Sequence, residues 1–452
     1  ATYVKLRSTH DDAQPASFNG TKPGIPTDNE QLTREAVLLL SLALYSFLMY
    51  RPRYRPGDKD PFVSYYRNSL CNLQKVNNDL LRKIFKKNRS CAYLADQSIS
   101  FLSSNEDSSS ISNEEEYLFI DEFRQKLPLT TYENYRDYID RMVDTGEKNL
   151  LSSDKIVYYA SSSGTTGKIK LLPITSAMFK HVFMLFNVGQ VAIWRSLPAS
   201  SFPLDHQRLF SLQSGKRFNA FLRSKDGTPI GPFSQFMSAL SFFPGSKLIG
   251  SSLGILDYEL IEGISDFETS TFVQLVFALT VQDISSYSVT FASSFLHTVK
   301  VIENHFEEMC LCISSSDFNH SSLVHENIHD GKFRTSLNQA LENVTLEYGG
   351  SSYRSERVHH IRRECLKKNT PGLLPRLWPQ LVFASTSLGS SFAMYKKEIE
   401  FYCGTQLPLI NCPIYGASEA FFGSLASIYT NEYFLSPTSA FYEFIEEEDI
   451  HQ

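Results

Sequence analysis

Apolar residues along the chain follow two patterns, helical spacing and short continuous runs. Residues 176–194 and 271–287 have apolar residues at helical spacing, and most of residues 300–370 follow the same helical spacing. Short apolar runs, which are typical of buried strands, occur at residues 156–160, 209–212, 289–293, 381–385, 409–415 and 441–444. Because the strands and helices alternate, the pattern predicts an α/β fold with its sheets covered by helices.

Amphipathic helices are also expected before residue 150. Within residues 60–95, Lys and Arg residues separate a set of apolar residues at helical spacing: Leu70, Leu73, Val76, Leu80 and Ile84. Residues 129–133 predict the cap of another helix, with Tyr132, Tyr135, Tyr138, Ile139 and Met142 on one face. We expect these tyrosines in the core rather than at a ligand. Residues 98–116 are rich in Ser and acidic residues and predict an exposed loop.

Three regions follow from these patterns: a flexible leader at 1–26, an N-terminal helical region at 27–116 and a core domain at 117–452. The apolar run at residues 36–50 is shorter than the roughly 20 residues that span a bilayer. A buried first helix is the main interpretation of this run. The alternative is a membrane-associated signal anchor flanked by Arg51 and Arg53.

Composition and charge exclude some classes of protein and of binding site. A chain of 452 residues with 42% hydrophobic residues can bury a large core. The net charge is only -6 and the basic residues are scattered, so no nucleic-acid partner is expected. The seven cysteines lack C-x-x-C spacing, and the adjacent His359 and His360 point in different directions on a helix, so neither predicts a metal site. Reduced thiols indicate a cytoplasmic protein; association with the endoplasmic reticulum through residues 36–50 is the alternative.

The strongest chemical signal is a Ser/Thr/Gly loop directly after the apolar run at residues 156–160. It comprises Ser162, Ser163, Gly164, Thr165, Thr166, Gly167, Lys168 and Lys170. Glycines let backbone N–H groups approach phosphate oxygens, hydroxyls donate to those oxygens and lysine neutralises their charge. The pattern is neither Walker A nor G-x-G-x-x-G. It predicts a phosphate-binding loop, with a flexible surface loop as the alternative.

A second segment, at residues 413–423, indicates which family of enzymes the chain resembles. It comprises Tyr415, Gly416, Ala417, Ser418 and Glu419, which alone could form a tight turn with a helix cap. The first loop resembles the signature loop of the adenylate-forming enzymes, and residues 413–423 resemble a block of the Gretchen Hagen auxin-responsive acyl acid amido synthetases. The resemblance covers roughly residues 123–444 and is weakest between residues 195 and 370.

The resemblance implies a large N-terminal domain of the adenylate-forming type, with mixed sheets covered by helices. Its implied activity is ATP-dependent activation of a small carboxylic acid as an acyl-adenylate, followed by conjugation to an amino acid or amine. The residues implied around the phosphates are Ser162, Ser163, Thr165 and Thr166 with Lys168 or Lys170. Tyr415, Gly416 and Ala417 would lie beside adenine, Ser418 would form a hydrogen bond, and Glu419 would bind Mg²⁺.

Departures from the family pattern leave alternatives open. The first loop is one residue shorter than the usual plant form, and Gly416-Ala417 replaces Ala-Ser, which indicates a non-plant branch. The family's third nucleotide block, hinge and small C-terminal domain do not follow Gln452, so a fragment or a naturally truncated relative is expected. The alternatives to an amido synthetase are a non-catalytic binding protein and an enzyme resembling acyl-CoA synthetases.

Overall fold

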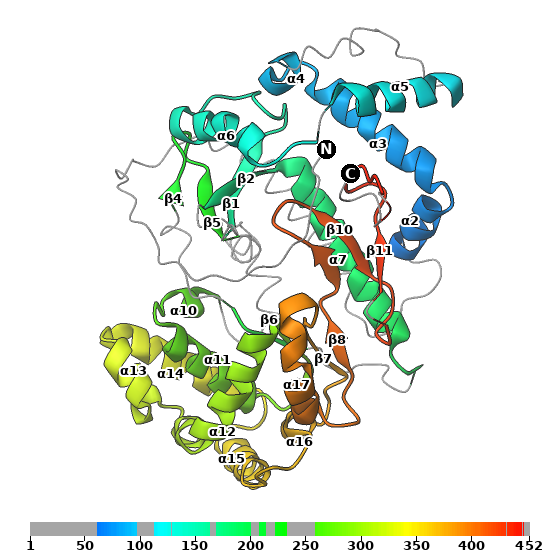
Figure 1. Ribbon diagram of the computed structural model, residues 1–452. Helices are drawn as coiled ribbons and strands as arrows, with labels where there is room; N and C mark the ends of the chain where they lie inside the picture. The colour runs from blue at the N-terminus through cyan, green and yellow to red at the C-terminus, as the bar shows by residue number, and fades with distance from the viewer. Residues whose placement is uncertain are drawn as a thin grey trace.

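In the part of the chain that the structure describes, helices surround three β-sheets (Figure 1). The computed structural model describes residues 61–96, 113–127, 129–162, 169–199, 208–213, 222–232, 258–430, 432–444 and 446. Helices from the later part of the chain gather in the lower half of the view, and most helices from before residue 200 lie in the upper half. The mixture of sheets and covering helices agrees with the predicted α/β class.

The lower half is built on a parallel sheet. Its strands, in spatial order, are β3 (Arg208–Ser211), β6 (Ile284–Phe291), β7 (Phe383–Ser387) and β8 (Leu409–Asn411). The helix α11 (Phe267–Thr280) is buried at every position from residue 269 to residue 280, as expected of a helix that is apolar on all sides. It packs against α12 (Ala292–Ser315), and the two helices supply a large share of the largest hydrophobic cluster.

The carboxyl end of α11 is capped by side chains from distant segments. The guanidinium of Arg357, on α15 (Ser351–Cys365), donates to the carbonyl oxygens of Leu279 at 2.6 Å and Val281 at 3.3 Å. The Trp378 indole donates to the carbonyl oxygens of Ala278 and Val281, each at 3.0 Å. Burial lowers the pKa of Arg357 to about 10. The orphan carbonyls at this buried helix end are thereby satisfied.

Most of the remaining helices of this half pack against α11, α12 or α15. The remaining helices are α10 (Tyr258–Glu262), α13 (Ser322–Asn327), α14 (Gly331–Leu346), α16 (Leu373–Leu377) and α17 (Lys396–Cys403), with short 3₁₀ turns at Phe318–His320 and Ser390–Tyr395. On α15, His359 is exposed as predicted, whereas His360 is half-buried with its Nε2 2.9 Å from the Arg376 carbonyl oxygen. Within the described ranges, no three His, Cys, Asp or Glu side chains gather to hold a metal.

The upper half contains a mixed sheet and an antiparallel sheet. The mixed sheet has the order β2-β1-β5-β4, with β1 (Ile156–Ser162), β2 (Lys170–Thr175), β4 (Leu222–Arg223) and β5 (Pro229–Pro232). The antiparallel sheet has the order β11-β10-β9, with β9 (Ile414–Gly416), β10 (Phe421–Leu425) and β11 (Tyr433–Leu435).

Around these two sheets lie α2 (Pro61–Leu70), α3 (Leu73–Asn88), α4 (Ala92–Asp96), α5 (Asn113–Lys126), α6 (Glu133–Thr145) and α7 (Ser176–Ser196). The prediction of one helix across residues 60–95 was wrong, because α2 ends at Leu70. The predicted apolar face was also partly wrong: the side chains of Leu73 and Ile84 are 48% and 37% exposed, while Leu81 and Phe85 are buried. The predicted loop at 98–116 ends earlier, since α5 begins at residue 113.

Some strand and helix boundaries also differ from the prediction. The predicted helix at 271–287 ends at residue 280, and residues 284–287 belong to β6, which in turn ends at residue 291. The predicted strand at 409–415 is split into β8 and β9, which belong to different sheets. The prediction of a last strand at 441–444 was wrong, because this segment pairs with no strand in the described part of the chain.

The N-terminal expectations concern residues outside the described ranges. The leader at 1–26 and the apolar run at 36–50 both lie there, so they remain predictions. None of the helices that the structure does describe is long and apolar enough to cross a membrane. The predicted region boundaries at residues 26 and 116 also remain predictions.

Candidate functional site

The antiparallel strands β1 and β2 bring together the two ends of the predicted phosphate-binding loop. Ser162, the last residue of β1, pairs with Lys170, the first residue of β2. The residues between them that were predicted to contact phosphates, Ser163, Gly164, Thr165, Thr166, Gly167 and Lys168, lie outside the described residues. Of the first predicted segment, Ser162 and Lys170 are therefore the residues whose geometry is known.

Lys170 lies against an aromatic ring that sequence analysis assigned to the core. Its Nζ is 5.6 Å from the centre of the Tyr132 ring, within the range of a cation–π contact. The Tyr132 hydroxyl accepts from the Leu171 N–H at 3.0 Å and donates to the Leu171 carbonyl at 3.2 Å. Tyr132 thus holds the free edge of β2 beside Lys170, a role that its apolar helical spacing did not reveal.

The second predicted segment forms a β-hairpin. Tyr415 and Gly416 end β9, Phe421 begins β10, and the N–H of Ala417 donates to the carbonyl of Ala420 at 2.9 Å. A Cβ atom on Gly416 would lie 2.7 Å from Cδ1 of Phe421, so a larger residue here would require the Phe421 ring to shift. The tip of the hairpin carries Ser418 and Glu419, both half-buried. The sequence alone allowed a tight turn followed by a helix cap in this segment. The structure has the tight turn, but a strand and not a helix follows it.

Tyr415 presents a partly free aromatic ring on this hairpin. Its side chain is 41% exposed, and its ring centre lies 5.7 Å from that of Phe422 and 5.4 Å from that of Tyr433. The two neighbouring rings restrain its orientation. A planar group could stack on the exposed part of the ring, as adenine would.

Glu419 supplies the carboxylate of the hairpin tip. Mg²⁺ is commonly bound by one or two protein carboxylates together with waters and substrate phosphates, because it prefers hard oxygen ligands. One carboxylate at the tip of an ordered hairpin therefore fits a magnesium ion shared with a nucleotide. The residue has the right chemistry, and its metal role remains a prediction.

The helix α7 joins the two segments. It follows β2 directly, and Figure 1 shows it passing behind β10. The Ser424 hydroxyl of β10 donates to the Leu185 carbonyl of α7 at 2.8 Å. Gly189 lets the helix approach the start of the hairpin, since a Cβ there would lie 2.5 Å from the Pro413 carbonyl oxygen. The two predicted segments are thus connected through one helix, although no direct contact between them is seen among the described residues.

A half-buried histidine on α7, whose Nε2 atom is fully buried, predicts that stability depends on pH. The Nε2 atom of His181 is buried without a hydrogen-bond partner in the described structure, and burial lowers its pKa to about 4. The unfolded chain takes up a proton near pH 6.5 while the folded protein stays neutral, so stability is lost as the pH falls from about 6.5 toward 4. Between pH 7 and pH 5, we expect the unfolding free energy of the wild type to fall by about 2 kcal/mol more than that of His181→Leu.

Urea unfolding at pH 7 and pH 5 measures this difference. His359→Leu is the matched control, because it removes an exposed histidine from α15 and should leave the acid sensitivity of the wild type unchanged. If His181→Leu loses as much stability on acidification as the wild type, the proposed neutral state of His181 is wrong.

All seven cysteines are free thiols, as predicted. Burial raises the pKa of Cys310, Cys312, Cys365 and Cys403 to about 12, so these thiols stay protonated and unreactive near neutral pH. The expectation that Cys310 and Cys312 are buried and inert agrees with the structure.

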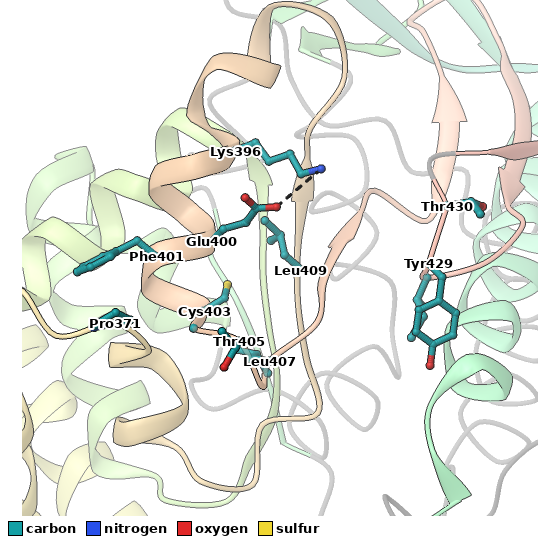
Figure 2. A pocket seen from close by; sticks show the side chains of 12 residues that line it. Pro371, Lys396, Glu400, Phe401, Cys403, Thr405, Leu407, Leu409, Tyr429 and Thr430 are labelled. Carbon is teal, nitrogen blue, oxygen red and sulfur yellow. Dashed lines mark ion pairs between the residues drawn. The ribbon is translucent and has the colours of Figure 1, made fainter.

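A cavity of about 570 Å³ lies away from the predicted site residues (Figure 2). It lies between α17 and the loop that follows β10, and Leu409 of the edge strand β8 borders it. Lys396 and Glu400 on α17 form an ion pair of 3.7 Å at its side. Of the predicted phosphate, adenine and metal residues that the structure describes, none lines this cavity, so we do not place the nucleotide there.

The known proteins most similar in sequence include plant amido synthetases. The chain is 26% identical over 414 residues to the indole-3-acetic acid-amido synthetase GH3.15 of Arabidopsis thaliana, covering 89% of this chain and 61% of the relative. It is 23% identical over 396 residues to the 4-substituted benzoates-glutamate ligase GH3.12 of Arabidopsis thaliana, covering 85% and 61%. The chain thus spans about three fifths of the length of these relatives.

A solved structure and a family match agree with this similarity. The GH3.15 acyl acid amido synthetase has the same fold, with a TM-score of 0.66 and 22% identity over 87% of this chain and 63% of that one. This likeness confirms the predicted adenylate-forming fold class. Residues 65–409 match the GH3 family N-terminal domain, which confirms the family resemblance. The chain therefore belongs to the GH3 family.

Proposed function

We propose that the protein activates a small carboxylic acid with ATP and transfers the acyl group to an amino acid or amine. Membership of the GH3 family supports a ligase of this kind, because the relatives are named as amido synthetases or as a benzoate-glutamate ligase. The observation that carries the proposal is the arrangement of the predicted segments: the strand after the phosphate-binding loop leads into α7, which packs against the Tyr415–Glu419 hairpin.

In the first half-reaction, a carboxylate oxygen of the acid attacks the α-phosphorus of ATP. A P–O bond to the acid forms, the P–O bond to pyrophosphate breaks, and acyl-adenylate and pyrophosphate result. Phosphoryl chemistry of this kind depends on positioning and charge neutralisation more than on an acid or base. The Ser162 hydroxyl and the Lys170 ammonium would donate to the phosphate oxygens, together with the predicted residues of the loop.

The hairpin would bind the rest of the nucleotide. Adenine would lie on the partly exposed ring of Tyr415, beside Gly416 and Ala417, and Ser418 would donate a hydrogen bond. Glu419 would hold Mg²⁺, whose charge neutralises the phosphates when it is bound. In the second half-reaction, the amine attacks the acyl carbonyl carbon, the bond to AMP breaks, and an amide, AMP and a proton are released.

The acceptor separates this proposal from an acyl-CoA synthetase. AMP release and product mass would be measured for the full-length protein with ATP, Mg²⁺ and aryl and alkyl carboxylic acids. Each acid would be tested with the 20 amino acids and, separately, with coenzyme A. We expect an amide product with an amino acid. A thioester with coenzyme A and no amide would contradict the proposal.

We place this reaction in the cytosol. The seven free thiols support a reducing compartment, because proteins of oxidising compartments commonly carry disulfides. Localisation of a tagged full-length protein tests the proposal, and an endoplasmic reticulum pattern would contradict it.

A further inference from the structure

Residues 436–444, called here the closing segment, are held by a side chain from the other end of the described chain. The Asn77 side-chain amide, on α3, donates from Nδ2 to the Pro437 carbonyl at 3.0 Å and the Ala440 carbonyl at 2.6 Å. Its Oδ1 accepts from the N–H of Tyr442 at 2.9 Å. Asn77 thus satisfies three backbone groups of the closing segment at once.

The N-terminal helices hold the closing segment at two further points. Phe441 packs edge-on against Phe123 of α5, with ring centres 5.5 Å apart, and joins the hydrophobic cluster that includes Leu81 of α3. Arg124 and Glu443 form an ion pair of 2.8 Å. These contacts place the segment against α3 and α5 and leave Asn77 as its main source of backbone hydrogen bonds from these helices.

On its other side, the closing segment contacts an irregularity in β10. The register between β9 and β10 shifts between Phe421 and Gly423, which leaves Phe422 as the bulged residue. The Phe422 carbonyl accepts from the Ser436 N–H at 2.7 Å, the Tyr442 hydroxyl at 2.8 Å and the Ser439 hydroxyl at 3.3 Å. Bulges reorient nearby side chains, and this one is fixed by three donors from the closing segment.

The bulge in turn supports the candidate nucleotide hairpin. The Phe422 ring packs against Tyr415, which was assigned above to the adenine. A continuous series of contacts therefore runs from Asn77 through Tyr442 and Phe422 to Tyr415. We propose that Asn77 is a positioning residue that sets the Tyr415 ring for nucleotide binding by fixing the closing segment. The inference rests on the function proposed above.

The amide group is suited to this task because it combines a donor and an acceptor. Alanine at residue 77 would leave the two carbonyls and the Tyr442 N–H without this partner, and each such loss weakens the attachment of the closing segment to α3. Tyr442→Phe is a milder test, since it keeps the ring and removes only the hydroxyl that donates to the Phe422 carbonyl. Asn78→Ala is the matched control: it lies next to Asn77 on α3, and among the described residues no hydrogen bond joins its side chain to the closing segment.

The experiment is calorimetric binding of a non-hydrolysable ATP analogue with Mg²⁺ to the full-length protein and these variants. We expect Asn77→Ala to weaken binding roughly tenfold and Tyr442→Phe several-fold, with Asn78→Ala unchanged. Where turnover is measured, the KM for ATP should rise while the KM for the acid stays the same. A purely structural role would lower the melting temperature of both variants and leave nucleotide affinity at the wild-type value.

The possible failures can be told apart. If the wild type does not bind the nucleotide, the proposed function fails, and with it this inference, before any variant is considered. If the wild type binds and both Asn77→Ala and Tyr442→Phe bind equally well, the inference is overturned while the proposed function stands. Should Asn77→Ala fail to fold, Tyr442→Phe decides alone: weakened nucleotide binding supports the inference, and wild-type affinity overturns it.

Discussion

Replacing Lys170 by alanine is expected to lower the rate of acyl-adenylate formation by roughly 10²- to 10³-fold, as losing one group that stabilises transition-state charge does in other enzymes. Lys170 starts β2, directly after the predicted phosphate-binding loop, and the Tyr132 ring restrains its side chain. The variant would leave the charge on the phosphates less compensated as pyrophosphate departs. Acid-dependent exchange of labelled pyrophosphate into ATP measures this rate.

Lys148→Ala is the matched control for this prediction. Lys148 is an exposed lysine in the turn after α6, and its removal should leave the exchange rate unchanged. The melting temperature of Lys170→Ala should stay near that of the wild type, because the ammonium takes part in no ion pair among the described residues. An exchange rate of Lys170→Ala within twofold of the wild type would refute the phosphate role of this lysine.

For Glu419→Gln, we expect the Mg²⁺ concentration that gives half of the maximal exchange rate to rise by at least about tenfold. The amide keeps the size of the side chain at the hairpin tip and removes its negative charge, so the neutral oxygen that remains is a weaker ligand for a hard divalent cation. Loss of a group that supports a metal site commonly weakens metal affinity 10- to 100-fold, roughly. Measuring the exchange rate at increasing Mg²⁺ and saturating ATP gives the Mg²⁺ concentration at half of the maximal rate.

Glu432→Gln is the corresponding control, because Glu432 is exposed near the other end of the same antiparallel sheet. This variant should need no more Mg²⁺ than the wild type. An unchanged Mg²⁺ requirement in Glu419→Gln would show that the carboxylate does not bind the metal, and a lowered ATP affinity at every Mg²⁺ concentration would assign it to the nucleotide instead.

The elements predicted best from the sequence are those with a single dominant pattern. The helix expected at 176–194 spans Ser176–Ser196, and the strand expected at 156–160 lies within β1. The error at 271–287 arose because the part of α11 from residue 269 on and the first four residues of β6 are all buried. Burial on all sides leaves no regular alternation of apolar and polar residues, and periodicity alone does not distinguish a buried helix from a buried strand.

The residues that the sequence did not reveal, Tyr132 and Asn77, each have a partner far away along the chain. Tyr132 contacts a strand 39 residues later in the chain, and Asn77 contacts a segment about 360 residues later. No local pattern encodes such pairs. The segment at 441–444 has the aromatic content of a strand, but the N–H of Tyr442 bonds to Asn77 instead of to a neighbouring strand. The residues of the candidate site could be predicted from the sequence because phosphate, adenine and Mg²⁺ are each bound by particular chemical groups.

Acid-dependent ATP–pyrophosphate exchange by the full-length wild-type protein tests the central claim most directly. The measurement needs ATP, Mg²⁺, labelled pyrophosphate and a panel of aryl and alkyl carboxylic acids, with no amine present. We predict exchange that depends on at least one acid and on Mg²⁺, because formation of the acyl-adenylate is reversible. An absence of exchange with every acid, together with no thermal stabilisation by ATP, would contradict the account and indicate a non-catalytic member of the family.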